Sequence, residues 1–245
     1  MSNEKKVYKD AILPLQKMLD KEEYVIDKSG SKLVELRPGY IHKFDPRKPL
    51  LEFEGRKSNK EYIEKESKWY ASQDLSINGW VDDVKIWTQV CTQDEKREVN
   101  SNYGYLVFSE QNGSQFDHCY EALMKNPYSR QAVIFYNRPS MHVDYNRNGM
   151  SDFTCTFYQQ FFIREDNKGK KRLYCINNMR SNDLVFGFLN DIAYFCEVYM
   201  KMYKKLKKVY KDLKIGYMDH IANSLHVYER HFDMLKNMRL KNDKK

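Results

Sequence analysis

The chain has 245 residues, of which 41% are hydrophobic and 31% are charged, and its formal net charge is +8. This composition is typical of a folded domain with a sizeable core and argues against intrinsic disorder. There is no run of about 18 apolar residues, and the N-terminal segment MSNEKKVYKD lacks the apolar core of a secretion signal, so we expect a cytoplasmic protein with no membrane partner.

The five cysteines are odd in number and form no Cys-x-x-Cys pair. They predict reduced thiols rather than a disulfide framework, and they indicate no metal site. No Pro-rich linker, internal repeat or low-complexity run divides the sequence. Residues 1–245 are therefore predicted to form a single domain.

The first half of the sequence predicts helices and one hairpin. A helix is expected over residues 7–21, where Pro14 marks either an interruption or a helix start. Two β-type runs around a Lys-Ser-Gly turn predict a hairpin within residues 22–36. Further helices are predicted over residues 59–72, 80–90 and 114–125. The last of them has Ser114 as its expected N-cap and ends at an Asn-Pro pair.

From Gln131 onward the sequence becomes aromatic and β-branched, which favours strands. A turn rich in Lys, Asp and Gly separates two of these runs and predicts a hairpin. Strands are predicted over 131–136, 152–163, 171–179 and 215–228, and helices over 187–206 and 229–240. Together the elements predict an α+β fold, in which a largely antiparallel sheet is covered by helices and one helix is central.

The excess charge lies in residues 201–245, which hold 13 Lys/Arg and 5 Asp/Glu. Apolar residues recur from Tyr199 to Leu213 at three- and four-residue steps, which predicts an amphipathic helix with solvated lysines. The stripe consists of Tyr199, Met202, Leu206, Val209, Tyr210 and Leu213. The alternative is a nucleic-acid-binding module, which needs exposed aromatics interleaved with the lysines. DNA binding that survives Cys155→Ser would favour it.

Cys155 follows a Gly/Asn-rich loop and lies early in an apolar run. A lone cysteine in such a run is usually a small buried hydrophobe. Its place near a strand mouth also suits an exposed nucleophile, whose pKa a nearby arginine would lower. Neither interpretation is excluded by this residue alone.

Other residues are candidates with ordinary alternatives. Arg130 opens a predicted strand, where a guanidinium can reach a ligand or another subunit. His226 and Tyr228 alternate along a strand and share a face. Glu66 lies on a predicted helix, where a surface acid is the usual interpretation, and Trp87 would ordinarily be a core residue.

Three segments, NRPSMHVDYNRNGMSDFTCT, NNMRSNDLVFGFLND and SLHVYERHF, resemble the thymidylate synthase superfamily. They are most similar to its phage branch, the deoxycytidylate hydroxymethylases. The resemblance runs in order from about residue 23 to residue 232 and contains the ungapped stretch from Arg180 to Asp191. It implies an α+β homodimer with a sheet face at the interface, two active sites each completed by a basic residue of the other chain, and, for a phage protein, the bacterial host cytoplasm.

The resemblance also implies residue roles. Cys155 matches the nucleophile that attacks C6 of the pyrimidine, Glu66 the glutamate that organises proton transfer and water, and Tyr103 a tyrosine near the catalytic water. Lys28, Arg180 and Ser181 are implied to bind the phosphate, together with Arg130 contributed by the other chain of the dimer. His226 and Tyr228 are implied to bind the sugar, and Trp87 and Asp183 the folate.

Asp191 stands where thymidylate synthases place asparagine. An asparagine amide matches uracil because it both donates and accepts. Cytosine presents the reverse edge, an N4 amino donor and a bare N3 acceptor. A carboxylate accepts from N4, and a proton shared with N3 completes the pair. The wrong base would leave buried polar groups unpaired at roughly 1–3 kcal/mol per group, so Asp191 favours dCMP.

The implied reaction uses methylenetetrahydrofolate as co-substrate and no metal. Cys155 adds to C6 of dCMP, C5 takes up the one-carbon unit, folate leaves, and water rather than hydride completes 5-hydroxymethyl-dCMP. Three departures from synthases stand out, at Gln131, Met179 and Thr156.

The nearest rival is a thymidylate synthase or hydroxymethylase that acts on dUMP. A zinc deaminase is disfavoured because no H-x-E with P-C-x-x-C occurs. The lysines leave open a contact with polyglutamylated folate or with a replication or nucleotide-synthesis complex.

Overall fold

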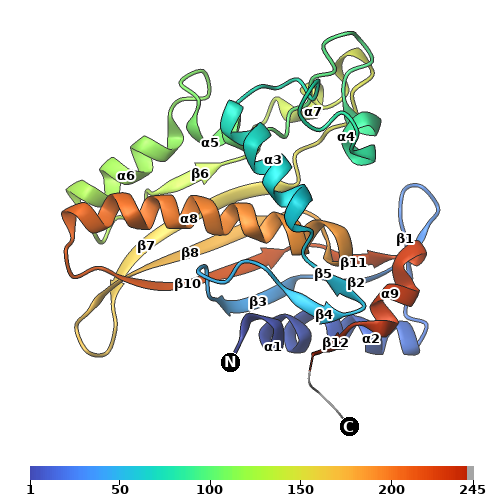
Figure 1. Ribbon diagram of the computed structural model, residues 1–245, viewed down its shortest axis with the longest axis horizontal. Helices are drawn as coiled ribbons and strands as arrows, with labels where there is room; N and C mark the ends of the chain where they lie inside the picture. The colour runs from blue at the N-terminus through green and yellow to red at the C-terminus, as the bar shows by residue number, and fades with distance from the viewer. Residues whose placement is uncertain (242–245) are drawn as a thin grey trace.

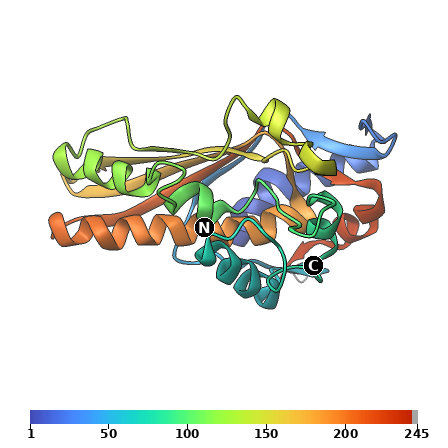
Figure 2. The same ribbon diagram turned by 90° about the horizontal axis from the view of Figure 1, so that it is seen from above.

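The computed structural model describes residues 1–241, and its long helix α8 (Leu189–Val209) runs along one side of the largest sheet (Figures 1 and 2). The five strands of this sheet follow the order β3, β10, β8, β7, β6. They are β3 (Gly39–Phe44), β6 (Val133–Phe135), β7 (Thr156–Glu165), β8 (Lys171–Met179) and β10 (Lys214–Ala222). β8 and β10 are parallel because α8 carries the chain back between them, and the other neighbours in the sheet are antiparallel.

Alternating side chains bury one face of β7 and β8. Phe161 and Ile163 of β7 and Leu173 and Cys175 of β8 have no exposed surface. Tyr199 of α8 is equally buried, and its hydroxyl donates to the carbonyl oxygen of Leu173. The core therefore lies between α8 and this face of the sheet.

The chain crosses from the large sheet into a second one at two adjacent points. The second sheet has the order β1 (Val25–Ile26), β2 (Lys32–Leu36), β11 (Leu225–Tyr228), β9 (Asn182–Asp183). The prediction of a single strand over 215–228 is wrong, because β10 ends at Ala222 and β11 begins at Leu225. The intervening backbone N–H groups of Asn223 and Ser224 donate to the carbonyls of Met179 and Arg180 at 2.8 and 3.2 Å. Arg180 thus lies at the crossing.

The predicted helix over 7–21 is longer and less regular than expected. It consists of α1 (Asn3–Val7), the π-helical turn η1 (Tyr8–Ile12) and α2 (Leu13–Asp20), with Pro14 in the first turn of α2. Pro14 lacks a backbone N–H and follows the π-helical turn η1 directly, an irregularity of the kind that accommodates a proline within a helix. The predicted hairpin is confirmed as the antiparallel pair β1–β2.

The middle of the chain forms short helices, of which α3 and α6 pack against α8. They are α3 (Lys60–Ser72), α4 (Lys85–Val90), α5 (Tyr103–Phe108), α6 (Gln115–Lys125) and α7 (Met141–Asp144), followed by the 3-10 turn η2 (Arg147–Gly149). Ser114 precedes α6 as predicted, but it is in the left-handed region and its side chain makes no capping bond. The predicted helix over 80–90 forms only in its second half, because a turn occupies residues 78–83.

The last third of the described chain contains more short elements than the sequence predicted. The π-helical turn η3 (Leu184–Phe188) leads into α8, and η4 (Glu229–His231) leads into α9 (Phe232–Asn237). A third, small sheet pairs β12 (Arg239–Leu240) with β4 (Glu52–Glu54) and β5 (Arg56–Lys57). The predicted α+β fold with mostly antiparallel strands is confirmed.

The prediction of an apolar helical stripe from Tyr199 to Leu213 is only partly right. α8 ends at Val209, which is 40% exposed, whereas Met202 and Leu206 are fully buried. The lysines pair locally, since Lys201 lies 2.8 Å from Glu197 and Lys205 forms an ion pair with Asp117 of α6. These contacts fit a solvated face. Among residues 1–241, no helix has the length and apolar character needed to cross a membrane.

Candidate active site

Cys155 lies directly before β7, at the crossing between the two sheets, and is partly exposed. Its carbonyl oxygen accepts a hydrogen bond from the backbone N–H of Arg180 at 2.8 Å. A guanidinium nitrogen of Arg180 lies 3.4 Å from the Cys155 sulfur. The structure therefore brings together two residues that are 25 positions apart in the sequence.

The Arg180 guanidinium is held by the loop that precedes Cys155. It donates to the carbonyl oxygens of Phe153 and Thr154 at 2.6 and 3.2 Å, and it stacks 5.1 Å from the centre of the Phe153 ring. Burial raises the pKa of Cys155 to about 11, although the charge of Arg180 opposes the rise. Arg180 does lower the pKa of this thiol, as expected, but desolvation of the thiolate outweighs the attraction, so the net shift is upward.

Glu66 is buried in the site rather than solvated, with 4% of its surface exposed. It accepts a hydrogen bond from Tyr62, one turn earlier on α3. The Tyr62 hydroxyl also accepts from the indole N–H of Trp87 at 3.1 Å, and Trp87 packs edge-on against Trp69 at 4.9 Å. Tyr62 was not among the predicted residues, although the four-residue spacing from Glu66 places both on one helix face.

Asp191 lies in the first turn of α8. Its Oδ2 accepts a hydrogen bond from the Asn182 amide at 2.8 Å. Burial raises the pKa of Asp191 to about 6. Burial, together with the charge of Asp191, raises the pKa of Glu66 to about 8. Two acids with different, elevated pKa values thus share one buried region, an arrangement that suits proton transfer near neutral pH.

The raised pKa of Glu66 makes the stability of the fold depend on pH. Because this pKa is higher in the folded chain than in the unfolded chain, protonated Glu66 stabilises the fold, and the contribution is lost as the pH rises through about 8. Between pH 7 and pH 9, we expect the free energy of unfolding to fall by about 1 kcal/mol more in the parent than in Glu66→Gln. Urea denaturation at both pH values measures this difference. An equal fall in the free energy of unfolding for both proteins would contradict the prediction.

Tyr103 of α5 contacts the first residue of β7. Its hydroxyl accepts a hydrogen bond from Thr156 at 2.8 Å, and its ring stacks on Tyr70 at 5.5 Å. Burial raises the pKa of Tyr103 well above its ordinary value, with the charges of Cys155 and Asp191 in the same direction. Tyr103 is therefore a neutral hydroxyl beside the thiol.

His226 and Tyr228 share one face of β11, as their spacing predicts, with ring centres 4.8 Å apart. His226 is buried, and burial lowers its pKa, so the ring is neutral near pH 7. Its Nδ1 lies 3.2 Å from the Ser224 hydroxyl. Tyr228 is partly exposed, and desolvation, together with the charge of Asp183, raises its pKa.

The remaining predicted residues lie at the periphery. Lys28 is exposed in the β1–β2 turn, and Arg130 is exposed between α6 and β6. Neither makes an ion pair with an acid in the part of the chain that the structure describes. Ser181 is partly exposed next to Arg180. Asp183 accepts from the backbone N–H groups of Val185 and Phe186, at 2.8 and 3.3 Å, so one of its oxygens caps η3.

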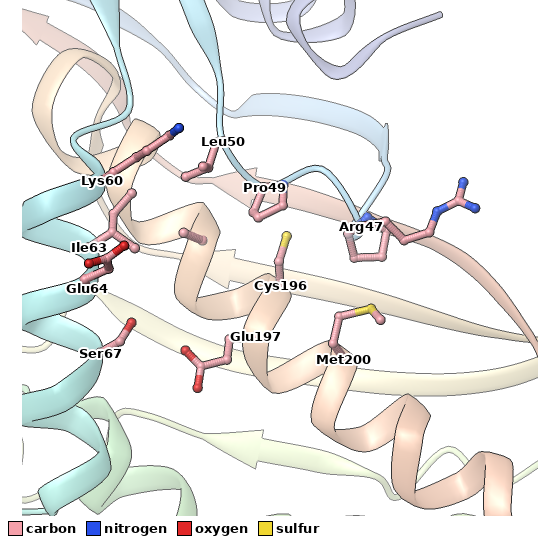
Figure 3. Close-up of a pocket in the computed structure, with 12 residues that line it drawn as sticks. Arg47, Pro49, Leu50, Lys60, Ile63, Glu64, Ser67, Cys196, Glu197 and Met200 are labelled. Carbon is pink, nitrogen blue, oxygen red and sulfur yellow. The ribbon is translucent and has the colours of Figure 1, made fainter.

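A cavity of about 650 Å³ lies elsewhere, between α3, α8 and the loop before β4 (Figure 3). Its lining includes Pro49, Lys60, Glu64 and Glu197. None of the predicted site residues lines it. Its one thiol, Cys196, is 1% exposed, and burial raises its pKa well above the ordinary value. The thiol of this cavity is therefore protonated near pH 7.

Comparisons with known proteins identify the family. A sequence profile of the family described as thymidylate synthase matches residues 6–245. The deoxycytidylate 5-hydroxymethyltransferase of Enterobacteria phage T4 is 40% identical over 217 residues, which cover 87% of this chain and 83% of that protein. The same values hold for the protein of that name from phage T2. The thymidylate synthase of Mycoplasma genitalium is 26% identical over 81% of this chain and 74% of its own length. The resemblance seen in the sequence is confirmed, and the chain belongs to the thymidylate synthase family.

Proposed function

We propose that this protein is a dCMP hydroxymethylase, which converts dCMP, methylenetetrahydrofolate and water to 5-hydroxymethyl-dCMP and tetrahydrofolate. The observation that carries the proposal is geometric: Arg180 lies 3.4 Å from the Cys155 sulfur, and Asn182, two residues further along the same segment, donates to the partly buried carboxyl group of Asp191. The relatives named deoxycytidylate 5-hydroxymethyltransferase, at 40% identity, support the same conclusion.

Asp191 gives the site its preference for cytosine. A protonated carboxyl group donates to N3 through one oxygen and accepts from the N4 amino group through the other. A pKa of about 6 keeps a protonated fraction near neutral pH, and pairing with N3 favours that fraction further. A proton at N3 withdraws electrons from the ring, which makes C6 more electrophilic.

Cys155 supplies the nucleophile for C6. As the S–C6 bond forms, the thiol proton leaves to solvent, and N3 takes the proton of the Asp191 acid, which becomes a carboxylate that accepts from N3–H. The Arg180 guanidinium, 3.4 Å from the sulfur, stabilises the negative charge as it develops. The bond to C6 turns C5 into an enamine carbon that accepts a one-carbon unit.

Methylenetetrahydrofolate supplies that one-carbon unit. The residues present fit such a molecule, because Trp87 is only partly buried and Phe186, beside Asp183, is 45% exposed, which leaves aromatic surface for a flat ring. Trp87 and Asp183 would hold the folate. Glu66 and the neutral hydroxyls of Tyr62 and Tyr103 would hold the water that completes the product.

A direct test is incubation with dCMP and methylenetetrahydrofolate, followed by mass analysis of the nucleotide. We expect a gain of one CH₂O unit. A gain of one CH₂ unit would indicate a methyl-transferring synthase. If dUMP reacted and dCMP did not, the proposed substrate would be wrong.

We also propose a homodimer formed through the face of the large sheet that α8 does not cover. Outward-facing aromatic residues lie there, and the rings of Tyr174 and Tyr217 pack edge-on at 4.7 Å. Both are only partly buried in the single chain, and Phe135 at the sheet edge is 58% exposed. An apolar face of this kind is typical of a subunit interface. Arg130, exposed near β6, would reach the partner's nucleotide phosphate.

Complementation between two inactive variants tests the shared site. Arg130→Ala and Cys155→Ser should each be weakly active or inactive alone. After mixing and subunit exchange, about half of the dimers are mixed, and each has one intact site, so about a quarter of the parent activity should return. Failure to recover activity, with mixed dimers shown by native mass spectrometry, would mean that Arg130 serves its own chain.

A further inference from the structure

The segment that carries Cys155 is attached at both ends to the segment that leads into α5. At one end, the carboxylate of Asp152 accepts two hydrogen bonds from Ser101. The backbone N–H donates to Oδ2 and the hydroxyl donates to Oδ1, both at 2.7 Å. At the other end, the Thr156 hydroxyl donates to the Tyr103 hydroxyl at 2.8 Å. We call the contact between Asp152 and Ser101 the clamp.

The residue next to the clamp fastens the same loop a second time. The amide nitrogen of Asn100 donates to the carbonyl oxygen of Asp152 at 3.0 Å, and its oxygen accepts from Arg138 at 3.2 Å. Arg138 also forms an ion pair with Asp144 at 2.8 Å. The loop that precedes Cys155 is therefore tied to the start of α5 by its backbone as well as by its side chains.

The clamp keeps a carboxylate in a position with little access to water. Asp152 is 8% exposed and Ser101 is 5% exposed. Burial raises the pKa of Asp152, but the hydrogen bonds from Ser101 and the charge of Arg180 oppose the rise. An apolar side chain would avoid the cost of burying a charge. The acid at this position is therefore explained by the two hydrogen bonds that it accepts.

The Cys155 sulfur makes two long polar contacts. It lies 3.9 Å from the carbonyl oxygen of Phe153 and 3.4 Å from the Arg180 guanidinium. That guanidinium donates to the carbonyl oxygens of Phe153 and Thr154, which lie between Asp152 and Cys155 in the chain. The position of the thiol thus depends on the backbone of residues 153–154, and the clamp holds this backbone from its N-terminal side.

We propose that Asp152, acting through Ser101, is a positioning residue that holds the Cys155 thiol where it can add to C6 of the pyrimidine. This inference rests on the proposed function. The clamp fixes the start of the segment and the bond from Thr156 to Tyr103 fixes its end, so the thiol keeps one place in the site. Covalent addition is sensitive to such placement, since a displacement of about 1 Å can lower the rate by about 10²-fold.

The test compares Asp152→Ala with Asp152→Asn. Asparagine can keep both bonds, because its oxygen accepts from the backbone N–H of Ser101 and its NH₂ group donates to the Ser101 hydroxyl. Alanine keeps neither bond. We expect Asp152→Ala to lower kcat per folded molecule by about 10²-fold, with the KM for dCMP changed by less than about threefold. Asp152→Asn should retain kcat within about threefold of the parent.

Two further variants separate the clamp from general stability. Ser101→Ala removes only the hydroxyl, so kcat should fall by about tenfold, and adding it to Asp152→Ala should cause no further loss. Asp166→Ala is the matched control, because Asp166 accepts from the backbone N–H groups of Lys168 and Lys170 beyond the far end of β7, at 2.9 and 3.1 Å. It should lower the temperature of thermal unfolding and leave kcat per folded molecule unchanged.

Alkylation with iodoacetamide tests the clamp without turnover. All five cysteines lie within residues 1–241, and Cys155 is the one that is not buried. Both variants at position 152 remove the same negative charge from beside the thiol, and both keep Arg180 and Asp191, so a difference between them reports the mobility of the segment. By mass spectrometry, we expect Cys155 to be alkylated about tenfold faster in Asp152→Ala than in Asp152→Asn at the same pH.

Equal alkylation rates in Asp152→Ala and Asp152→Asn would overturn the proposal, because the hydrogen bonds would then not restrain the thiol. Equal losses of kcat in these two variants would overturn it as well, since the charge alone would explain both. A comparable loss in Asp166→Ala would mean that stability is the cause. If the parent protein hydroxymethylates neither dCMP nor dUMP, the proposed function fails, and the two alkylation rates still decide whether the clamp holds the thiol.

Discussion

Replacing Cys155 with serine should lower kcat for 5-hydroxymethyl-dCMP formation by about 10⁴-fold or more, without unfolding the protein. A serine hydroxyl is a far weaker nucleophile than a thiol, and the site offers Arg180 but no neighbouring base that touches residue 155 among the described contacts. The side chains are nearly isosteric, so the hydrogen bonds of Arg180 to Phe153 and Thr154 should persist. Product formation by mass analysis and thermal unfolding are the two measurements.

Cys119→Ala is the matched control for the loss of a thiol. Cys119 lies on α6, is 2% exposed, and its pKa is raised to about 12 by burial. This variant should lose some stability but keep its turnover per folded molecule. If Cys155→Ser kept a rate near that of the parent, the covalent addition to C6 would be abandoned.

Replacing Asp191 with asparagine should reverse the nucleotide preference. The amide can donate to O4 and accept from N3–H of uracil. In the same orientation it places its NH₂ group against the N4 amino group of cytosine and its oxygen against the N3 acceptor. With two mismatched groups at roughly 1–3 kcal/mol each, the ratio of kcat/KM for dCMP over dUMP should shift by about 10²–10⁴-fold toward dUMP. Asn182 keeps an acceptor at position 191, so the local fold should survive.

Asp233→Asn is the matched control for Asp191, because the Asp233 side chain is 98% exposed on α9. It should leave both nucleotides unaffected. Kinetics with each nucleotide at saturating methylenetetrahydrofolate give the two ratios. If Asp191→Asn kept the parent's ratio of kcat/KM for dCMP over dUMP, a group other than Asp191 would have to distinguish cytosine from uracil.

Much of the sheet was predictable because burial on one face imposes alternation. The strands around Phe161 and Leu173 follow this pattern, and the turn between them is rich in charged residues and glycine. The break in the strand after Ala222 was not predictable in the same way. β-type residues flank Asn223 on both sides, and only the three-dimensional structure shows that the two halves pair with different neighbours.

The site was predictable in its residue types but not in its electrostatics. Arg180 does lie beside Cys155, yet the net direction of the thiol pKa depends on burial, which the sequence does not reveal. The partners of Asp191 were missed for a related reason. His220 lies in an apolar alternating run and contacts Asn182 from 38 positions away, so no local spacing links the two.

The position of β10 has a consequence for synthesis on the ribosome. β10 inserts between β3 and β8, although both of those strands leave the ribosome well before it does. Until then each has a bare edge of unpaired backbone groups, the kind of surface that pairs with other chains. Because translation adds only about 5–20 residues per second, the nascent protein spends seconds in this vulnerable form. A holding chaperone on those edges would therefore raise the yield of native enzyme.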